Sequence, residues 1–150
     1  MLAHIGPASQ PAIRNYNSNK PPPTEFLRCN VDAALFTISN QVSMGACIRD
    51  EKGRFLAATT RYINAKKNDT GRRRSMGLQQ AMTWMGMFGY HKVIFHMDCK
   101  MVVDDAHNKK YNLSEYGSLI DDCRTILSNY SNFIVAFTRR QANGSAHALA

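Results

Sequence analysis

Two carboxylates lie where a folded chain must compensate their charge. Asp32 lies inside an apolar stretch, between Val31 and Ala33, and Asp98 ends the mostly apolar run KVIFHMD. A carboxylate buried in a core strand, or ending one, is costly unless it is paired or binds a metal. If their two strands are neighbours, Asp32 and Asp98 would begin an oxygen-ligand metal site.

A structural role is also open for Asp98. It precedes the segment CKMVVDDAHN, which has the pattern of a short helix, and Asp is a favoured N-cap residue. Asp32 is harder to explain structurally, because it lies in the middle of its stretch. The residues alone therefore favour a functional role for Asp32 and leave Asp98 as either a helix cap or a ligand.

The element that must hold Asp32 is the first of three predicted strands. Strand-forming residues predominate in three stretches: 26–37, 41–50 and 54–63. A short turn is predicted at Ser39-Asn40, and residues 50–53 (DEKG) predict a hairpin turn with Gly53 at positive φ. The three strands should form an antiparallel meander.

The periodicity then changes to that of a helix. Apolar residues recur at intervals of three and four: Leu78, Ala81, Met82, Met85 and Phe88. They predict one face of an amphipathic helix, which Gly89 should terminate.

Strands and helices alternate through the rest of the chain: a buried strand at 92–98, a short helix at 99–108, a helix at 113–130, a strand at 132–140 and a last helix from Ala142. Ser114 is a candidate N-cap, and the apolar stripe that follows it comprises Leu119, Ile120, Cys123, Ile126 and Leu127. The order βββαβααβα predicts an α/β domain with a mixed sheet and helices on its faces. The helix before the fourth strand is a crossover, so this strand should run parallel to a meander strand.

The chain divides into a leader and one domain. Residues 1–24 hold all five prolines, including Pro21-Pro22-Pro23, together with Asn, Ser and Gln. That composition is typical of a linker or disordered leader. Residues 25–150 suit a single domain. Because its last helix stops at Ala150, we expect this domain to be truncated at the C-terminus.

The charge balance suggests a polyanionic partner. The chain has 19 Lys and Arg against 11 Asp and Glu, for a formal net charge of +8. Nucleic acid or an anionic membrane surface would suit this balance, and simple solubility is the alternative interpretation. No run approaches the roughly 20 apolar residues of a transmembrane helix, so we expect no membrane partner.

The cysteines suggest a reducing compartment. They are widely spaced, at Cys29, Cys47, Cys99 and Cys123, and form no CxxC pair or Cys/His cluster. The first residues lack the apolar run of a signal peptide. We therefore expect reduced thiols in an intracellular protein, nuclear or cytoplasmic and not secreted.

Four segments carry a family resemblance: residues 21–36 (PPPTEFLRCNVDAALF), 45–60 (GACIRDEKGRFLAATT), 93–104 (VIFHMDCKMVVD) and 137–150 (FTRRQANGSAHALA). Together they resemble the ribonuclease H-type domains of plant proteins derived from non-LTR retroelements. The resemblance implies a five-stranded mixed sheet in the order 3-2-1-4-5, flanked by helices. It also implies hydrolysis of the RNA strand in an RNA/DNA hybrid, and we expect a monomer that binds such a hybrid or a duplex.

The resemblance implies two Mg²⁺ (or Mn²⁺) ions held by four acidic positions. The Asp of the first strand matches Asp32, and the Asp that ends the fourth matches Asp98. The Glu of the first helix falls on Arg74, four residues before Leu78, so helical spacing puts both on the face toward the sheet. The last acidic position, in the motif ANGSAHALA, falls on His147.

These replacements predict an impaired metal site. Two Mg²⁺ ions bring four positive charges within about 4 Å of each other, and only two carboxylates remain to offset them. The imidazole of His147 suits Mg²⁺ poorly. Arg74 adds a positive charge, and we expect it in the first helical turn, where the helix dipole disfavours cations. We expect weakened metal binding and weak or absent cleavage, unless the alignment slips and Asp69, Asp104 or Asp105 supplies a ligand.

Candidate phosphate contacts flank this site. Arg72 and Arg73, next to Arg74, could hold phosphates, or could be a solvated loop and helix start. Arg139 and Arg140 follow the fifth strand and could also touch phosphate. Asn143 could orient substrate or cap the last helix.

The other polar and aromatic residues have structural interpretations. We expect Trp84 and the methionines of the first helix in the core rather than in a stacking platform, and three histidines as structural or surface residues: His91, His96 and His107. Three functions stay open. They are a hybrid nuclease, a module that recognises duplex by shape and backbone without cleaving it, and a marginally folded relic.

Overall fold

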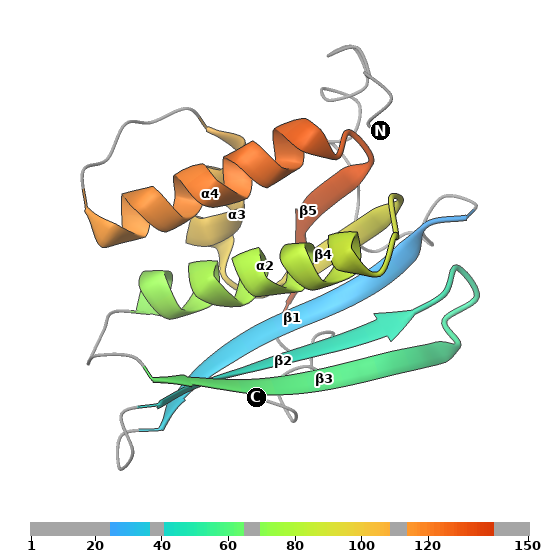
Figure 1. Cartoon of the computed structure of the whole chain (residues 1–150), viewed down its shortest axis with the longest axis horizontal. Coiled ribbons are helices and arrows are strands. Elements are labelled where there is room, and N and C mark those ends of the chain that lie inside the picture. Colours follow the sequence, from blue (N-terminus) through green and yellow to red (C-terminus); the bar gives the residue numbers. More distant parts are fainter. Residues whose placement is uncertain (1–24, 37–40, 65–69, 109–113, 140–150) are drawn as a thin grey trace.

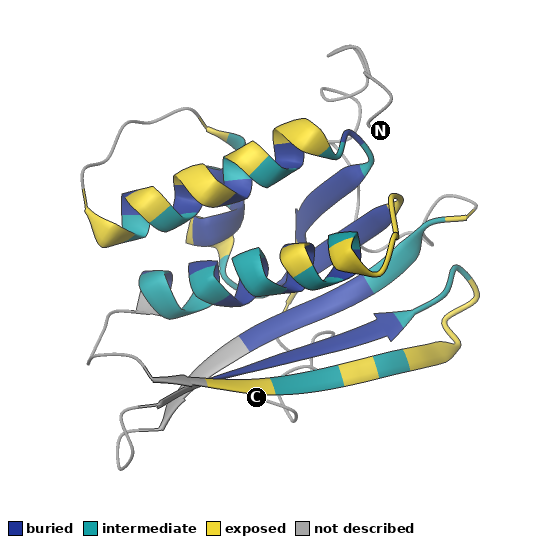
Figure 2. Cartoon of the chain, in the orientation of Figure 1, coloured by how far each residue is buried: buried dark blue, intermediate teal, exposed yellow. Residues whose placement is uncertain are grey.

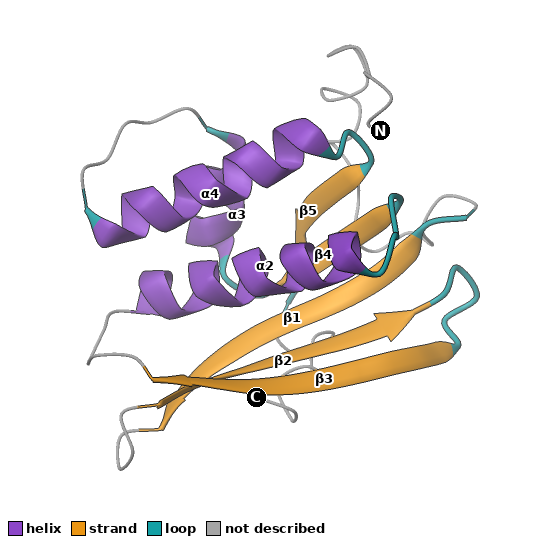
Figure 3. Ribbon diagram, in the orientation of Figure 1, coloured by secondary structure: helices purple, strands orange, loops and turns teal. Residues whose placement is uncertain are grey.

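The computed structural model describes residues 25–36, 41–64, 70–108 and 114–139. Its elements are β1 (Leu27–Phe36), β2 (Gln41–Arg49), β3 (Phe55–Asn64), α2 (Thr70–Met87), β4 (Val93–Met97), α3 (Lys100–His107), α4 (Glu115–Asn129) and β5 (Phe133–Phe137). Figures 1 and 3 show these elements as a sheet and its helices. The predicted leader, the turn at Ser39-Asn40 and the helix from Ala142 lie outside the described residues.

The strands form one mixed sheet in the order β3-β2-β1-β4-β5. The pairs β1–β2 and β2–β3 are antiparallel, which confirms the predicted meander. Strand β4 runs parallel to β1 and to β5. Helix α2 makes the crossover from the edge strand β3 to β4, as parallel pairing requires. The topology is the one that the resemblance implies.

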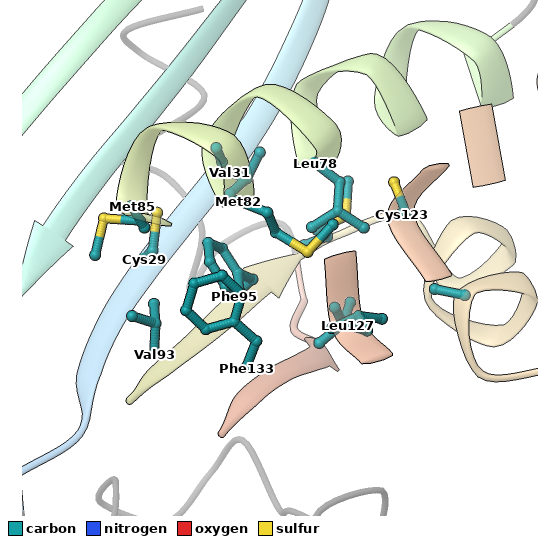
Figure 4. Packing of buried hydrophobic residues seen from close by; sticks show 14 of the residues in the cluster. Cys29, Val31, Leu78, Met82, Met85, Val93, Phe95, Cys123, Leu127 and Phe133 are labelled. Atoms are coloured by element: carbon teal, nitrogen blue, oxygen red, sulfur yellow. The ribbon is translucent and has the colours of Figure 1, made fainter. Parts of the chain in front are cut away.

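A single large cluster of buried side chains joins the sheet to all three helices. Val31, Phe95 and Phe133 contribute from the strands, and Leu78 and Met82 from α2 (Figure 4). Phe95 and Phe133 meet edge to face with ring centroids 5.0 Å apart, a favourable aromatic geometry. Figure 2 shows the buried surface of the helices turned toward the buried strands. Burying this apolar area supplies the main driving force for folding.

Strand β4 is buried along its whole length. Its alternate residue Ile94 belongs to a second, smaller cluster with Ile134 and Ala136. A parallel strand buried on both faces reads as a near-continuous apolar run. This explains why residues 92–98 could be predicted as a strand without any alternation of polar residues.

Helix α2 ends as predicted, although one member of its apolar face is misplaced. Gly89 has φ +80°, and the N–H of Tyr90 donates to the carbonyl of Met85 at 3.1 Å, which closes the last turn. The predicted face members Leu78, Ala81, Met82 and Met85 are buried. The prediction for Phe88 is wrong: it lies just past the helix, and its ring is 62% exposed.

Helix α4 begins at its predicted cap. The Ser114 side chain accepts a hydrogen bond from the N–H of Gly117 at 3.1 Å. Of the predicted stripe, Ile120, Cys123 and Leu127 are buried, and the remaining two are half-buried. The turn before β3 is also confirmed, with Gly53 at φ +80°.

All four cysteines are free thiols, as predicted. Within the described ranges, no helix combines the length and the hydropathy needed to cross a membrane.

Candidate functional site

Parallel pairing of β1 with β4 brings the two carboxylates to the same level of the sheet. Asn30 pairs with His96 at the end of this ladder, and Asp32 and Asp98 each follow two residues later. Strand β1 continues against β2, with Asp32 opposite Gly45, whereas β4 ends one residue before Asp98. The connection from β4 to α3 therefore starts beside Asp32.

Helix α2 delivers a cation to these carboxylates. Arg74 lies one turn before Leu78, which is fully buried against the sheet, so the two side chains share a helix face. The Nη1 atom of Arg74 donates to Oδ1 of Asp32 and to Oδ1 of Asp98, the latter at 2.8 Å. The three positions that the resemblance aligns with acidic ligands thus meet at one point.

These three side chains are withdrawn from water. The exposed fractions are 0% for the side chain of Asp32, 5% for Asp98 and 13% for Arg74. Salt screens buried charges much less than exposed ones, and arginine does not lose its proton in proteins. Removing one member of such a buried ion pair leaves an uncompensated charge and is strongly destabilising. The guanidinium is therefore an integral part of this end of the sheet.

This set of side chains does not fit a pair of Mg²⁺ ions. Magnesium takes oxygen ligands, and here a guanidinium holds one oxygen of each carboxylate that would bind it. A fixed positive charge at that distance would repel a divalent ion in a partly dry site. Across the described part of the chain, no three His, Cys, Asp or Glu side chains gather as a potential metal site. Two-metal hydrolysis therefore does not follow from these residues.

Of the two roles left open for Asp98, the structure excludes the helix cap, and the expected place of Arg74 in the first helical turn is wrong. Helix α3 begins at Lys100 and its N-cap is Cys99, so Asp98 does not cap it; the carboxylate pairs with Arg74 instead. Helix α2 begins at Thr70, which places Arg74 in the second turn rather than the first. The dipole effect falls off within the first turn, so it contributes little against Arg74.

The other two arginines of the cluster lie inside α2 and not in a loop. Arg72 Nη1 is 2.9 Å from Oε2 of Glu115, at the start of α4. This ion pair links the N-terminal ends of the two helices. Glu115 is a partner that the sequence analysis does not identify, because nothing local in the sequence connects it to Arg72. Arg73 is half-buried in the same turn.

Arg139 is exposed directly after β5. The N–H of Thr138 donates to the carbonyl of Met97 at 2.7 Å, which extends the β4–β5 ladder by one residue. Arg139 therefore leaves the sheet at the same end as Asp98. The predicted contacts Arg140, Asn143 and His147 lie outside the described residues.

The carboxylates considered as substitutes are engaged elsewhere or fall outside the described residues. Asp104 pairs with Lys100 at 2.9 Å, and Asp105 accepts a hydrogen bond from the hydroxyl of Tyr116. Asp69 lies outside the described residues. The recorded partners of Asp104 and Asp105 are thus Lys100 and Tyr116, and not Arg74.

Trp84 is a core residue with one open side. It packs against the main cluster and lines a groove of about 280 Å³ between α2 and the strands β2 and β3. Arg61 Nη1 donates to Oε1 of Gln80 at 3.3 Å beside it. The prediction that Trp84 lies in the core is therefore confirmed in part. The groove could not be predicted from the spacing of residues along the helix.

The three histidines have the structural or surface positions predicted for them. Burial lowers the pKa of His96 to about 4, and the charge of Arg28 contributes in the same direction. His107 Nε2 is 2.8 Å from the carbonyl oxygen of Val135. His91 stacks on a tyrosine ring with centroids 6.1 Å apart.

Comparisons with solved structures agree with this topology. The chain is similar to ribonuclease H1 from the halophilic archaeon Halobacterium salinarum NRC-1, with a TM-score of 0.73, 16% identity and coverage of 83% of this chain and 94% of that one. For an N-terminal ribonuclease H domain from Mycobacterium tuberculosis the TM-score is 0.70, with 16% identity and coverage of 85% and 91%. A ribonuclease H1 isolated from compost was solved in complex with an RNA/DNA hybrid. Its TM-score is 0.69, with 19% identity and coverage of 82% of this chain and 92% of that one. At these identities the likeness concerns the fold.

Sequence comparison gives the family. No curated protein matches the chain. The family model described as reverse transcriptase-like matches residues 30–150, which begin inside β1 and include all the following elements. A match over most of the chain, on a ribonuclease H fold, shows that the protein belongs to the reverse transcriptase-like family.

Proposed function

We propose that this chain is a ribonuclease H-like domain that binds RNA/DNA hybrid or duplex nucleic acid and has lost most or all RNA-strand cleavage. The observation that carries the proposal is the position of Arg74, which donates to both Asp32 and Asp98. The fold supports a nucleic-acid partner, and the side chains argue against the reaction.

Three features support binding. A structural neighbour of this chain was solved with an RNA/DNA hybrid bound, and the chain carries a formal charge of +8. Arg139 is exposed at the end of the sheet where the carboxylates lie. Cations at such a position neutralise phosphates, which contributes affinity without sequence preference. Duplexes that contain RNA are recognised mostly by their shape and backbone.

The loss of cleavage rests on charge. Two-metal catalysis needs ions that stabilise both the attacking and the leaving oxygen. Asp32 and Asp98 are two of the four acidic positions, and one oxygen of each is held by Arg74. To bind these oxygens, Mg²⁺ or Mn²⁺ would have to displace the guanidinium of Arg74, which is part of the chain and cannot diffuse away. We therefore expect neither ion to bind tightly at this site.

The family resemblance suggests an origin in a plant retroelement, which we include in the proposal.

A relic that folds only marginally is the alternative to a binding module. The continuous core favours a folded module over such a relic, and a cooperative thermal melt is the expected behaviour of a single domain of this size.

Binding is tested by fluorescence anisotropy with labelled RNA/DNA hybrid, double-stranded RNA and double-stranded DNA in EDTA. We expect affinity to fall steeply with salt, with the logarithm of the binding constant linear in the logarithm of the salt concentration. Arg139→Ala should weaken binding and lower the salt slope by about 1. No salt-dependent binding to any of the three would contradict the proposal.

Lys52→Ala is the matched control. Lys52 is exposed in the β2–β3 turn, at the opposite end of the sheet, and its removal deletes the same unit charge. Affinity and salt slope should stay close to those of the native chain. An equal loss in Lys52→Ala and Arg139→Ala would mean that net charge alone, and not this end of the sheet, attracts the nucleic acid.

A further inference from the structure

We infer that Arg74 is the resident cation of this site: its guanidinium takes the place of a divalent ion between β1 and β4, so that the native chain folds without divalent metal and acquires a divalent-cation site only when Arg74 is removed. This inference concerns the folding of the domain. It holds whether or not the chain binds nucleic acid, so the two proposals can fail separately.

The geometry at Arg74 resembles the convergence of ligands on an ion. A single nitrogen atom, Nη1, donates to one oxygen of Asp32 and to one oxygen of Asp98. These carboxylates come from neighbouring strands, and the nitrogen comes from the helix that crosses above them. One positive centre therefore joins three elements that are distant in the sequence. A metal ion held by two carboxylates would make a comparable junction between the strands.

The burial of the carboxylates makes a cation at this point strongly favourable. Asp32 has no exposed side-chain surface and Asp98 has 5%. Two carboxylates that share a site repel each other strongly, because both charges are desolvated. Arg74 offsets this repulsion from inside the protein. Without it, the two oxygens would remain close together in a buried place, where a cation from solution or protonation would lower their repulsion.

A tethered cation behaves differently from a bound ion. A metal ion has a finite affinity, and a chelator removes it, so a fold that depends on it loses stability in EDTA. Arg74 cannot dissociate and does not lose its proton. The stability of the native chain should therefore be the same in EDTA and in excess Mg²⁺ or Mn²⁺.

The test uses the full chain, with thermal unfolding followed by circular dichroism in EDTA, in MgCl₂ and in MnCl₂. The native Tm should not change among the three. Arg74→Ala should lower the Tm in EDTA by roughly 10 °C, because a buried pair is broken. Mn²⁺ should restore a large part of that loss, and the electron paramagnetic resonance signal of free Mn²⁺ should fall when this variant is added.

Arg72→Ala is the matched control. It removes the same side chain from the same helix, but its partner Glu115 has a side chain that is 76% exposed. Water can solvate that carboxylate, so no metal dependence should appear. The inference would be overturned if the Tm of the native chain rose with Mn²⁺. It would also be overturned if Mn²⁺ did not change the Tm of Arg74→Ala.

A double variant keeps the test decisive if Arg74→Ala does not fold. Asp32→Asn combined with Arg74→Met removes one buried negative charge together with the cation. If repulsion between the two carboxylates is the cause, this variant should fold in EDTA with a Tm independent of Mn²⁺. An unfolded double variant would mean that Arg74 contributes by packing, and the inference would be wrong.

Discussion

Nη1 of Arg74 and Oδ1 of Asp98 lie 2.8 Å apart, although most of helix α2 and the whole of β4 lie between the two residues in the sequence. The contact depends on where α2 crosses the sheet and on the length of β4. Both are fixed by the buried apolar residues of the main cluster, such as Leu78 and Phe95. The core thus positions a cation where the family fold is expected to gather carboxylates.

Ser114→Ala should lower the free energy of unfolding by about 1 kcal/mol, the usual cost of losing an N-cap. The Ser114 hydroxyl accepts from the N–H of Gly117 at 3.1 Å, and alanine leaves that donor without its protein partner. Urea unfolding measures the change. Ser118→Ala, on the exposed side of the same helix, is the control and should be neutral or slightly stabilising. Equal losses in both variants would argue against the cap.

His96 should make the domain sensitive to mild acid. Burial lowers the pKa of His96 from 6.5 to about 4, so the folded state binds its proton less readily than the unfolded state does. Stability is therefore constant above pH 6.5 and is lost as the pH falls from 6.5 toward 4, by about 3 kcal/mol over that window.

The contribution of His96 is isolated by comparing pH dependence and not absolute stability. His96→Gln places a polar group that does not titrate in this range at the same position. Urea unfolding at several pH values should give a shallower decline for this variant between pH 6.5 and 4. Parallel declines for the native and variant chains would assign the acid sensitivity to other groups.

The thiols should differ sharply in reactivity. Cys99 is half-buried, whereas Cys29, Cys47 and Cys123 are buried. Burial raises the pKa of Cys123 to about 12 and raises the pKa of Cys29 well above its usual range. The thiolate is the reactive species, so alkylation of the native chain at neutral pH should modify Cys99 first.

Mass spectrometry of peptides after a short alkylation checks this order. Cys99→Ser should abolish the fast reaction, and all four thiols of the native chain should react in denaturant. Rapid modification of Cys123 without denaturant would show that α4 separates from the core more readily than the complete burial of Cys123 suggests.

Much of the fold could be predicted from the sequence because each element has a clear local pattern. Gly53, Gly89 and Ser114 mark turns and helix ends through backbone chemistry that depends on few neighbours. Helical spacing from Leu78 was sufficient to place Arg74 on the face toward the sheet. The strand order 3-2-1-4-5 came from the family resemblance, since strand patterns alone do not define which strands are neighbours.

The error at Phe88, and the points that the sequence left open or did not reveal, concern positions that depend on packing. Phe88 follows the helical period, but α2 ends just before it and its ring is exposed. Asp98 has the residue type of an N-cap, yet the pull of Arg74 and the start of α3 at Lys100 give it another role. The pairing of Arg72 with Glu115 depends on how two helices align, which no local spacing reveals.

The most direct test of the account is cleavage of a labelled RNA/DNA hybrid in Mg²⁺ and in Mn²⁺ by the native chain, Arg74→Glu and Arg74→Ala. We expect no cleavage by the native chain, because Arg74 holds the oxygens of Asp32 and Asp98. Arg74→Glu replaces that cation with a third carboxylate and should gain metal-dependent cleavage, whereas Arg74→Ala should gain less or none. Clear metal-dependent cleavage by the native chain would contradict the account.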